Sequence, residues 1–196
     1  MVATGQYLER PTLIPVGREV MEGLSHRGAR RPLLLVLSPL PEEGGGMDHV
    51  VGAELSWAAA RAGFPSLRFN WRGVGGSQGR RGRLPSLIED ARAALEVARD
   101  NAGGAKPLIA SIGGSFEVAT ALEGDAAGVC LVSPTDIDEW GADVWVVVAQ
   151  ADLSAKLKVA TGRLHVIPGA DRTFQKNLPL VGKAVVECLN ALETLE

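Results

Sequence analysis

The sequence is poor in cysteine, histidine and aromatic residues, and it contains no long uninterrupted apolar run. Its two cysteines, Cys130 and Cys188, are too few for a disulfide scaffold, and each lies in an apolar segment where a small buried side chain is expected. No segment reaches the roughly 18 apolar residues of a membrane span, and no basic segment followed by an apolar stretch opens the chain. We therefore expect a soluble protein of the reducing cytoplasm.

The chain also lacks an excess of charge of one sign. It has 20 Lys and Arg residues against 23 Asp and Glu residues, a formal net charge of −3. This balance argues against nucleic acid or a membrane surface as a partner, because both attract an excess of positive charge. With 196 residues, of which 46% are hydrophobic and 22% charged, the sequence predicts a single globular domain over residues 1–196.

Apolar segments with strand character alternate with helical patterns along the chain. Strands are expected at residues 32–38, 66–70, 108–112, 128–133, 144–149 and 163–167, and helices at 48–62, 85–101, 115–122 and 179–195. Most strand segments are continuously apolar, which is typical of strands covered on both faces. The alternation predicts an α/β fold with a mostly parallel sheet and helices on both faces. Residues 11–16 and 19–25 are expected to form an antiparallel edge, Asp48 to cap the first helix and Gly63 to end it.

Two glycine clusters follow strands, where an α/β sheet places ligands. The second, residues 72–79 (RGVGGSQG), departs from the dinucleotide fingerprint because no helix opens directly behind it, and no P-loop pattern is present. The sequence therefore predicts no nucleotide, and we expect no other cofactor and no metal. The first cluster, residues 44–46, is interpreted as a connecting turn, with an anion site as the alternative. The basic group Arg80, Arg81 and Arg83 is interpreted as a solvated loop.

Residues 108–122 (LIASIGGSFEVATAL) carry the strongest chemical signal. An apolar strand runs into Gly-Gly-Ser and then directly into a small-residue helix, the arrangement that lifts a serine above the sheet as a nucleophile elbow. The elbow pattern is G-x-S-x-G, whereas this chain has Gly113-x-Ser115-x-Glu117 and lacks the second glycine. The segment alone leaves open whether Ser115 is a nucleophile or the cap of the following helix.

Residues 68–79 (RFNWRGVGGSQG) resemble the RFNFRGVGxSxG motif of small lidless bacterial α/β-hydrolases, a group related to dienelactone hydrolases and short-chain esterases. Further segments resemble the same family in the same order. These are residues 38–47 for its HPHP segment and glycine turn, 112–122 for the elbow, 147–152 for the acid loop and 167–174 for its PGADHFF loop. The resemblance spans nearly the whole chain and implies an α/β-hydrolase fold without a cap domain.

The resemblance places Ser115 at the nucleophile and Asp152 at the acid, but Arg172 where the general base should stand. A guanidinium stays charged and has no acceptor, so Arg172 cannot take the serine proton. We expect Arg172 to pair with Asp152 or Glu117, or to anchor an acidic ligand. The ligand-binding positions that the resemblance implies are Ser38 and Leu40, which replace the two histidines of HPHP, together with Gly114, Phe116, Glu117 and Arg72.

Three histidines, His26, His49 and His165, are available to replace the missing base. His165 lies within the expected last strand, so we expect it to pack in the sheet rather than reach the site. His49 follows the glycine turn at the edge of a hydrolase pocket and is therefore the one candidate for a rescue base.

Three interpretations of function follow. In the first, the chain is a catalytically impaired pseudoenzyme or small-ligand binding protein, in which Arg172 either holds an acidic ligand in the pocket or closes the site. In the second, it is a weak serine ester or thioester hydrolase that uses Ser115, since losing the base costs about 10⁴- to 10⁶-fold in turnover without removing every contribution. In the third, it is an interaction protein that forms a homodimer through the last helix, although core packing also explains the helical spacing of Val181, Val185 and Leu189.

Overall fold

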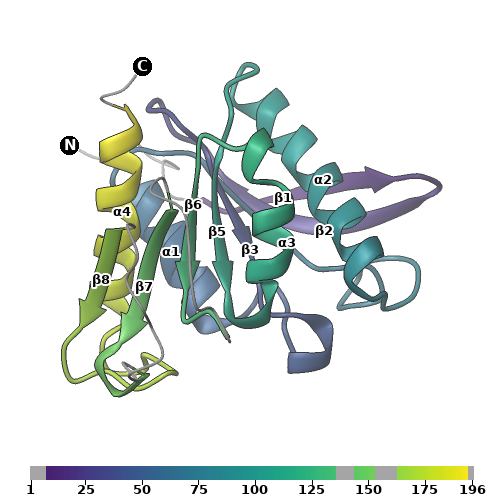
Figure 1. Ribbon diagram of the computed structural model, residues 1–196. Coiled ribbons are helices and arrows are strands. Elements are labelled where there is room, and N and C mark those ends of the chain that lie inside the picture. The colour runs from purple at the N-terminus through teal and green to yellow at the C-terminus, as the bar shows by residue number, and fades with distance from the viewer. Residues whose placement is uncertain (1–7, 136–143, 153–162, 194–196) are drawn as a thin grey trace.

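The computed structural model describes residues 8–135, 144–152 and 163–193. Its centre is an eight-stranded sheet in the order β1-β2-β4-β3-β5-β6-β7-β8 (Figure 1). The strands are β1 (Arg10–Val16), β2 (Glu19–His26), β3 (Leu34–Leu37), β4 (Ser66–Phe69), β5 (Leu108–Ile112), β6 (Gly128–Val132), β7 (Val144–Ala149) and β8 (Arg163–Ile167). Strands β3 to β8 are parallel, whereas β1 and β2 form an antiparallel hairpin that joins β4. The predicted strands and the antiparallel edge are confirmed.

Helices cover both faces of the sheet. Helices α1 (Val50–Arg61) and α4 (Leu178–Glu193) pack together on one face, and α2 (Leu84–Asn101) and α3 (Phe116–Ala121) cover the other (Figure 1). The positions of the four helices follow the predicted alternation.

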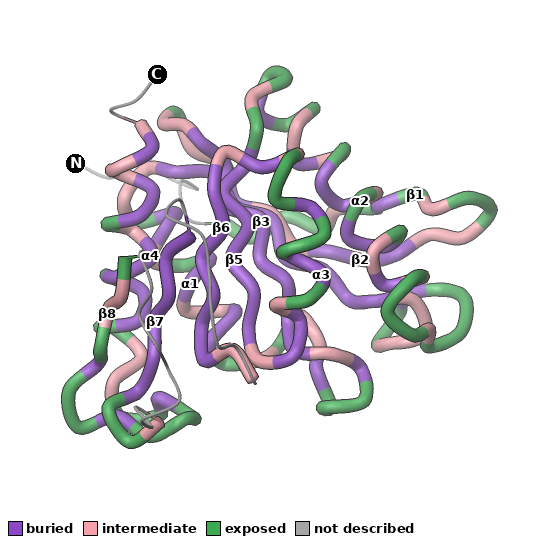
Figure 2. Tube along the Cα trace, in the orientation of Figure 1, coloured by how far each residue is buried: buried purple, intermediate pink, exposed green. Residues whose placement is uncertain are grey.

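A strand between two helical layers needs apolar side chains throughout, because its successive residues point to opposite faces. In β3, Leu35 and Leu37 lie in the core beneath α2 and α3, whereas Leu34 and Val36 lie in the core beneath α1 and α4. Figure 2 shows the central strands buried along their length. The predicted α/β architecture with two covered faces is therefore confirmed.

Two predicted helix signals need correction. Helix α1 begins at Val50 with His49 at its N-cap position, and no side chain caps it, so the predicted Asp48 cap is wrong. The reason is a turn in which the His49 N–H donates to the Gly46 carbonyl at 3.0 Å, which places the helix start beyond Asp48. Gly63 follows the end of α1 with φ of +90°, the left-handed conformation expected of a helix-ending glycine.

In the described parts of the chain, no helix is both long and apolar enough to cross a bilayer. Cys130 on β6 and Cys188 on α4 are buried in the core between the sheet and the α1–α4 layer. Neither is in a disulfide, so the expected role as small buried side chains is confirmed.

Candidate functional site

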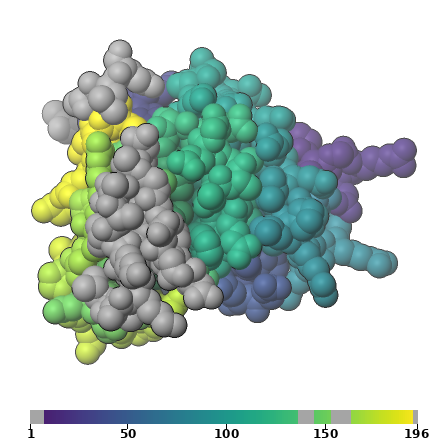
Figure 3. Space-filling view, in the orientation of Figure 1, coloured from purple at the N-terminus to yellow at the C-terminus, as the bar shows by residue number. Residues whose placement is uncertain are grey.

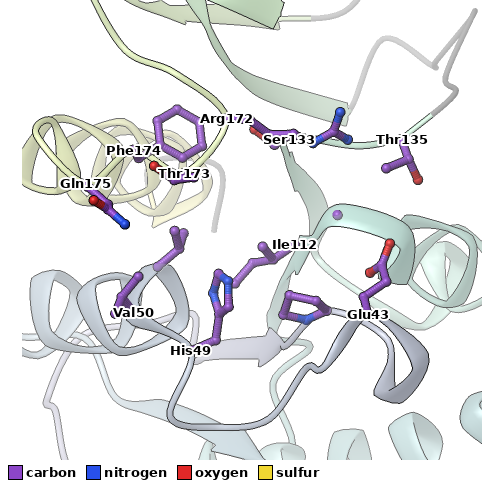
Figure 4. Close-up of a pocket in the computed structure, with 13 residues that line it drawn as sticks. Glu43, His49, Val50, Ile112, Ser133, Thr135, Arg172, Thr173, Phe174 and Gln175 are labelled. Atoms are coloured by element: carbon purple, nitrogen blue, oxygen red, sulfur yellow. The ribbon is translucent and has the colours of Figure 1, made fainter.

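A pocket of about 360 Å³ opens at the carboxyl ends of the parallel strands, the edge at which α/β sheets place ligands. It is lined by the segment between β3 and α1, the turn after β5, the loop after β6 and the segment after β8. Figure 4 shows Glu43 and His49 on one side of the pocket, with Ser133 and Thr135 on the other. Four segments far apart in the sequence therefore meet at one cavity.

The backbone around this pocket adopts unusual conformations. Three of its lining residues have φ in the left-handed region: Gly113 at +62°, Ser133 at +46° and Phe174 at +52°. Among the described residues, Ser133 and Phe174 are the only residues other than glycine with such angles. Glycine adopts such angles freely, but for Ser133 and Phe174 they cost about 1–3 kcal/mol each and persist only where the surroundings fix them, often at binding sites. Their clustering marks the pocket as the candidate functional site.

Ser115 does not reach the pocket. Its side chain is fully buried, and its hydroxyl donates to the Ile112 carbonyl at 2.9 Å and accepts the Ile112 N–H at 3.0 Å, with the Leu37 carbonyl oxygen 3.3 Å away. It is not among the described residues that line the cavity. The expectation of an exposed Ser115 hydroxyl is therefore wrong. The alternative expectation, a cap on α3, is also wrong, because the hydroxyl binds back to the end of β5 instead.

Gly113, rather than Ser115, occupies the turn that faces the pocket. Strand β5 ends at Ile112, and Gly113 follows directly and lines the pocket. A Cβ at Gly113 would have Glu43 Oε2 as its nearest neighbour, at 3.3 Å. Sequence reasoning missed Gly113 because it located the elbow by its serine. The available signal was the end of the apolar strand, one residue before Gly113.

The pocket also holds a carboxylate that the sequence did not single out. Glu43 ends the 3₁₀ turn over Pro41–Glu43, and its Oε2 accepts the N–H groups of Leu40 and Gly114, each at 3.1 Å. Leu40 follows β3 and Gly114 follows β5, so the carboxylate bridges two loops. No local sequence pattern connects Glu43 with a partner 71 positions away.

His49 and Arg172 both line the pocket. The Nδ1 atom of His49 is buried and has no hydrogen-bond partner within the described residues. Burial lowers the pKa of His49 while the Glu43 carboxylate opposes the shift, so the imidazole is neutral near pH 7. Arg172 is exposed, and none of the described side chains forms an ion pair with it. The expected pairing of Arg172 with Asp152 or Glu117 is therefore not present.

Six further predicted positions are not among the described residues that line the pocket. Two of them, Leu40 and Gly114, instead donate their backbone N–H groups to Glu43. Asp152 ends the 3₁₀ turn after β7, and its Oδ2 is buried without a hydrogen-bond partner in the described ranges. Ser38 is buried, Phe116 packs against the core beneath α2 and α3, and Glu117 is exposed on α3. Among the described side chains, no group of three or more His, Cys, Asp and Glu residues is placed to hold a metal ion.

Arg72 does not serve the pocket either, which corrects its predicted ligand-binding role. Its backbone N–H donates to Asp90 Oδ2 at 3.1 Å, and its guanidinium forms ion pairs with Asp90, with Glu19 at 3.3 Å and with Glu89 at 3.0 Å. Burial raises the pKa of Asp90, and its hydrogen bonds with Arg72 oppose that shift. The arginine is thus committed to holding the loop after β4 against α2 and β2.

A search of protein-family models and a search of curated proteins found no match. Solved structures, by contrast, match along nearly the whole chain. An α/β serine hydrolase homologue from Coxiella burnetii has a TM-score of 0.77 at 21% identity, covering 92% of this chain and 97% of that one. A serine hydrolase without a lid from Xanthomonas campestris has a TM-score of 0.76 at 21% identity, covering 93% and 94%. Est1E from Butyrivibrio proteoclasticus, solved with ferulic acid bound, has a TM-score of 0.76 at 13% identity, covering 93% and 99%.

Proposed function

We propose that this chain, which has the lidless α/β-hydrolase fold predicted from its sequence, binds a small acidic ligand in its pocket and lacks serine-nucleophile chemistry. The proposal rests on Gly113, which stands directly after β5, where an elbow holds its serine, and has no side chain. Aligned on this turn, the G-x-S-x-G pattern becomes Ser111-x-Gly113-x-Ser115, with glycine and serine exchanged.

The loss of the base supports the same conclusion. Arg172 stands where the family resemblance places the histidine, and a guanidinium cannot accept a proton. Ser115 would have to give up its hydrogen bonds with the Ile112 backbone before it could approach a substrate. A Ser-His-Asp system needs its nucleophile and its base together, so both changes act against hydrolysis.

The remaining cavity suits a small acid. Apolar side chains of Val50, Ile112 and Phe174 line it, and Arg172 supplies positive charge. A guanidinium presents a planar fork of donors that matches the two oxygens of a carboxylate. A volume of about 360 Å³ lies at the small end of the range for ligand pockets.

The alternative function is a weak serine ester or thioester hydrolase that uses Ser115. His49 favours it, because a neutral imidazole with an unpartnered, buried Nδ1 in the described structure is chemically able to act as a base. The alternative requires the turn around Ser115 to rearrange, since this side chain is fully buried.

Turnover of 4-nitrophenyl butyrate and labelling by a fluorophosphonate probe separate the two functions. We expect the wild-type chain to show no more of either than its Ser115→Ala variant. The Arg172→His variant should stay inactive, whereas Gly113→Ser combined with Arg172→His should gain a fluorophosphonate label at position 113. Wild-type turnover that Ser115→Ala abolishes would establish the hydrolase instead.

Ligand binding is tested by calorimetry with butyrate and with the neutral butyramide of the same shape. We expect butyrate to bind more tightly than butyramide. The Arg172→Gln variant should lose about tenfold in affinity for butyrate, because a neutral amide replaces the positive charge and the fork of donors of the guanidinium. Arg83→Gln, which removes an exposed arginine outside the described pocket lining, is the matched control. Equal affinity for the acid and the amide would exclude an acidic ligand.

A further inference from the structure

Two backbone N–H groups from different loops converge on a single oxygen in the pocket. The N–H of Leu40 and the N–H of Gly114 each donate to Glu43 Oε2 at 3.1 Å. Fixed amides that point at one position form an anion site, and hydrogen bonds to a charged acceptor are among the stronger ones in proteins. Glu43 is thus a bound carboxylate that the chain itself supplies.

The backbone leaves room for this carboxylate because both residues after β5 are glycines. A Cβ at Gly114 would lie 2.8 Å from Glu43 Oε1, and a Cβ at Gly113 would lie 3.3 Å from Oε2. Glu43 itself is an exposed residue, so its side chain can rotate into water without movement of the backbone. The anion position can therefore be vacated at the cost of the two hydrogen bonds to the Leu40 and Gly114 amides.

A second polar group in the same cavity lacks a partner. Ser133 is 6% exposed and lines the pocket, and within the described structure its buried Oγ has no hydrogen bond. Its φ of +46° shows that the surroundings hold it in a strained conformation. A buried hydroxyl without a partner is costly, so this side chain is explained best by an oxygen or nitrogen atom of a ligand.

We propose that Glu43 is an internal occupant of the anion subsite formed by the amides of Leu40 and Gly114, and that the carboxylate of a small aliphatic acid displaces it. The inference rests on the proposed ligand-binding function and specifies its ligand class and its regulation. The hydrocarbon part of the acid packs against Ile112 and Phe174, and Ser133 donates to the acid. Glu43 turns to solvent when the acid binds. In the free protein, the Glu43 carboxylate fills the anion subsite.

Removing the internal carboxylate tests the proposal. We expect Glu43→Ala to bind butyrate about tenfold more tightly than the wild-type chain, because the ligand no longer competes with a tethered carboxylate. In ¹⁵N-labelled protein, the amide resonances of Leu40 and Gly114 should shift when butyrate is added to either protein. Glu42→Ala removes the neighbouring exposed carboxylate, which does not line the described pocket, and should leave the affinity unchanged.

The proposal is overturned if Glu43→Ala binds butyrate no more tightly than the wild-type chain, or if the Leu40 and Gly114 amides do not respond at saturation. If circular dichroism shows that Glu43→Ala is unfolded, Glu43→Gln is measured by the same two criteria, since it keeps the size of the side chain and removes its charge. Butyrate binding that depends on Arg172 but not on Glu43 would overturn this inference alone. Absence of butyrate binding to every variant would overturn the proposed function as well.

Discussion

His26 lies in β2 with its side chain 2% exposed, and its Nδ1 is 3.0 Å from the Ser66 hydroxyl. Burial lowers the pKa of His26, the nearby Arg68 guanidinium lowers it further, and the Glu9 carboxylate opposes the shift. An imidazole in the unfolded chain titrates near pH 6.5, so below that pH the unfolded state binds the proton that the folded state resists. The contribution of His26 to stability is therefore complete above about pH 6.5 and is lost as the pH falls.

We expect the free energy of unfolding, measured with urea at pH 7.5 and pH 5.0, to fall more in the wild-type chain than in a His26→Asn variant. The pKa of His49 is also lowered by burial and contributes with the same sign, but it is present in both proteins and cancels from the comparison. An equal fall in the two proteins would mean that His26 is protonated as readily in the folded state as in the unfolded state.

Individual residues also mark the limit of what the sequence predicts. Ser115 and Gly113 lie only two positions apart, yet Ser115 is buried and Gly113 forms the turn at the pocket. This difference depends on the end of β5 at Ile112 and on the positive φ angle of Gly113. Neither quantity is visible in a motif that is recognised by its serine. The ligand-binding role predicted for Arg72 was wrong for a different reason. Its partner Asp90 lies on another element, and the sequence does not show which elements become neighbours.

At the scale of elements the prediction was more successful. Strands β3, β5, β6 and β7 are buried at every residue, and this pattern appears in the sequence as short continuous apolar runs. The helix ends were less well predicted, since the N-terminus of α1 depends on a turn at Gly46 rather than on a capping side chain. Burial on both faces leaves a strong compositional signal, whereas a turn of a few residues leaves a weak one.

The close approach of α1 and α4 gives a prediction for these two elements. A Cβ on Gly182 in α4 would lie 2.8 Å from the Ala58 Cβ and 2.7 Å from Glu54 Oε1 in α1. We expect Gly182→Ala to destabilise the chain by about 1–3 kcal/mol in urea unfolding, because overpacking outweighs the better helix propensity of alanine. Lys183→Ala, at an exposed position of the same helix, should change stability by less than about 0.5 kcal/mol. A stabilised Gly182→Ala variant would show that the helices separate at little cost.

For the whole molecule, the two thiols report on cooperative unfolding. Cys130 on β6 and Cys188 on α4 are both fully buried in one core, and hydrogen bonding with Cys130 together with burial raises the pKa of the Cys188 thiol. Only the thiolate reacts with a disulfide reagent, so we expect no reaction in the native state at pH 8 and two equivalents in 6 M guanidinium. Both thiols should react at one rate set by global opening. Fast reaction of one thiol in the native state would indicate that α4 detaches alone.

The hairpin of β1 and β2, at the edge of the sheet opposite β8, projects from the body of the molecule (Figures 1 and 3). Its outer strand β1 carries Pro11 and Pro15, which face Leu24 and Val20 of β2. Prolines are tolerated in an edge strand only where the missing N–H would point away from the sheet. In a strand, the backbone N–H groups of alternate residues point to the same side, so residues 11, 13 and 15 all face away from β2. Of these three, only Leu13 has an N–H group that could donate to another strand. A foreign strand approaching this margin meets an interrupted ladder, which protects the chain from fibril-like stacking along β1.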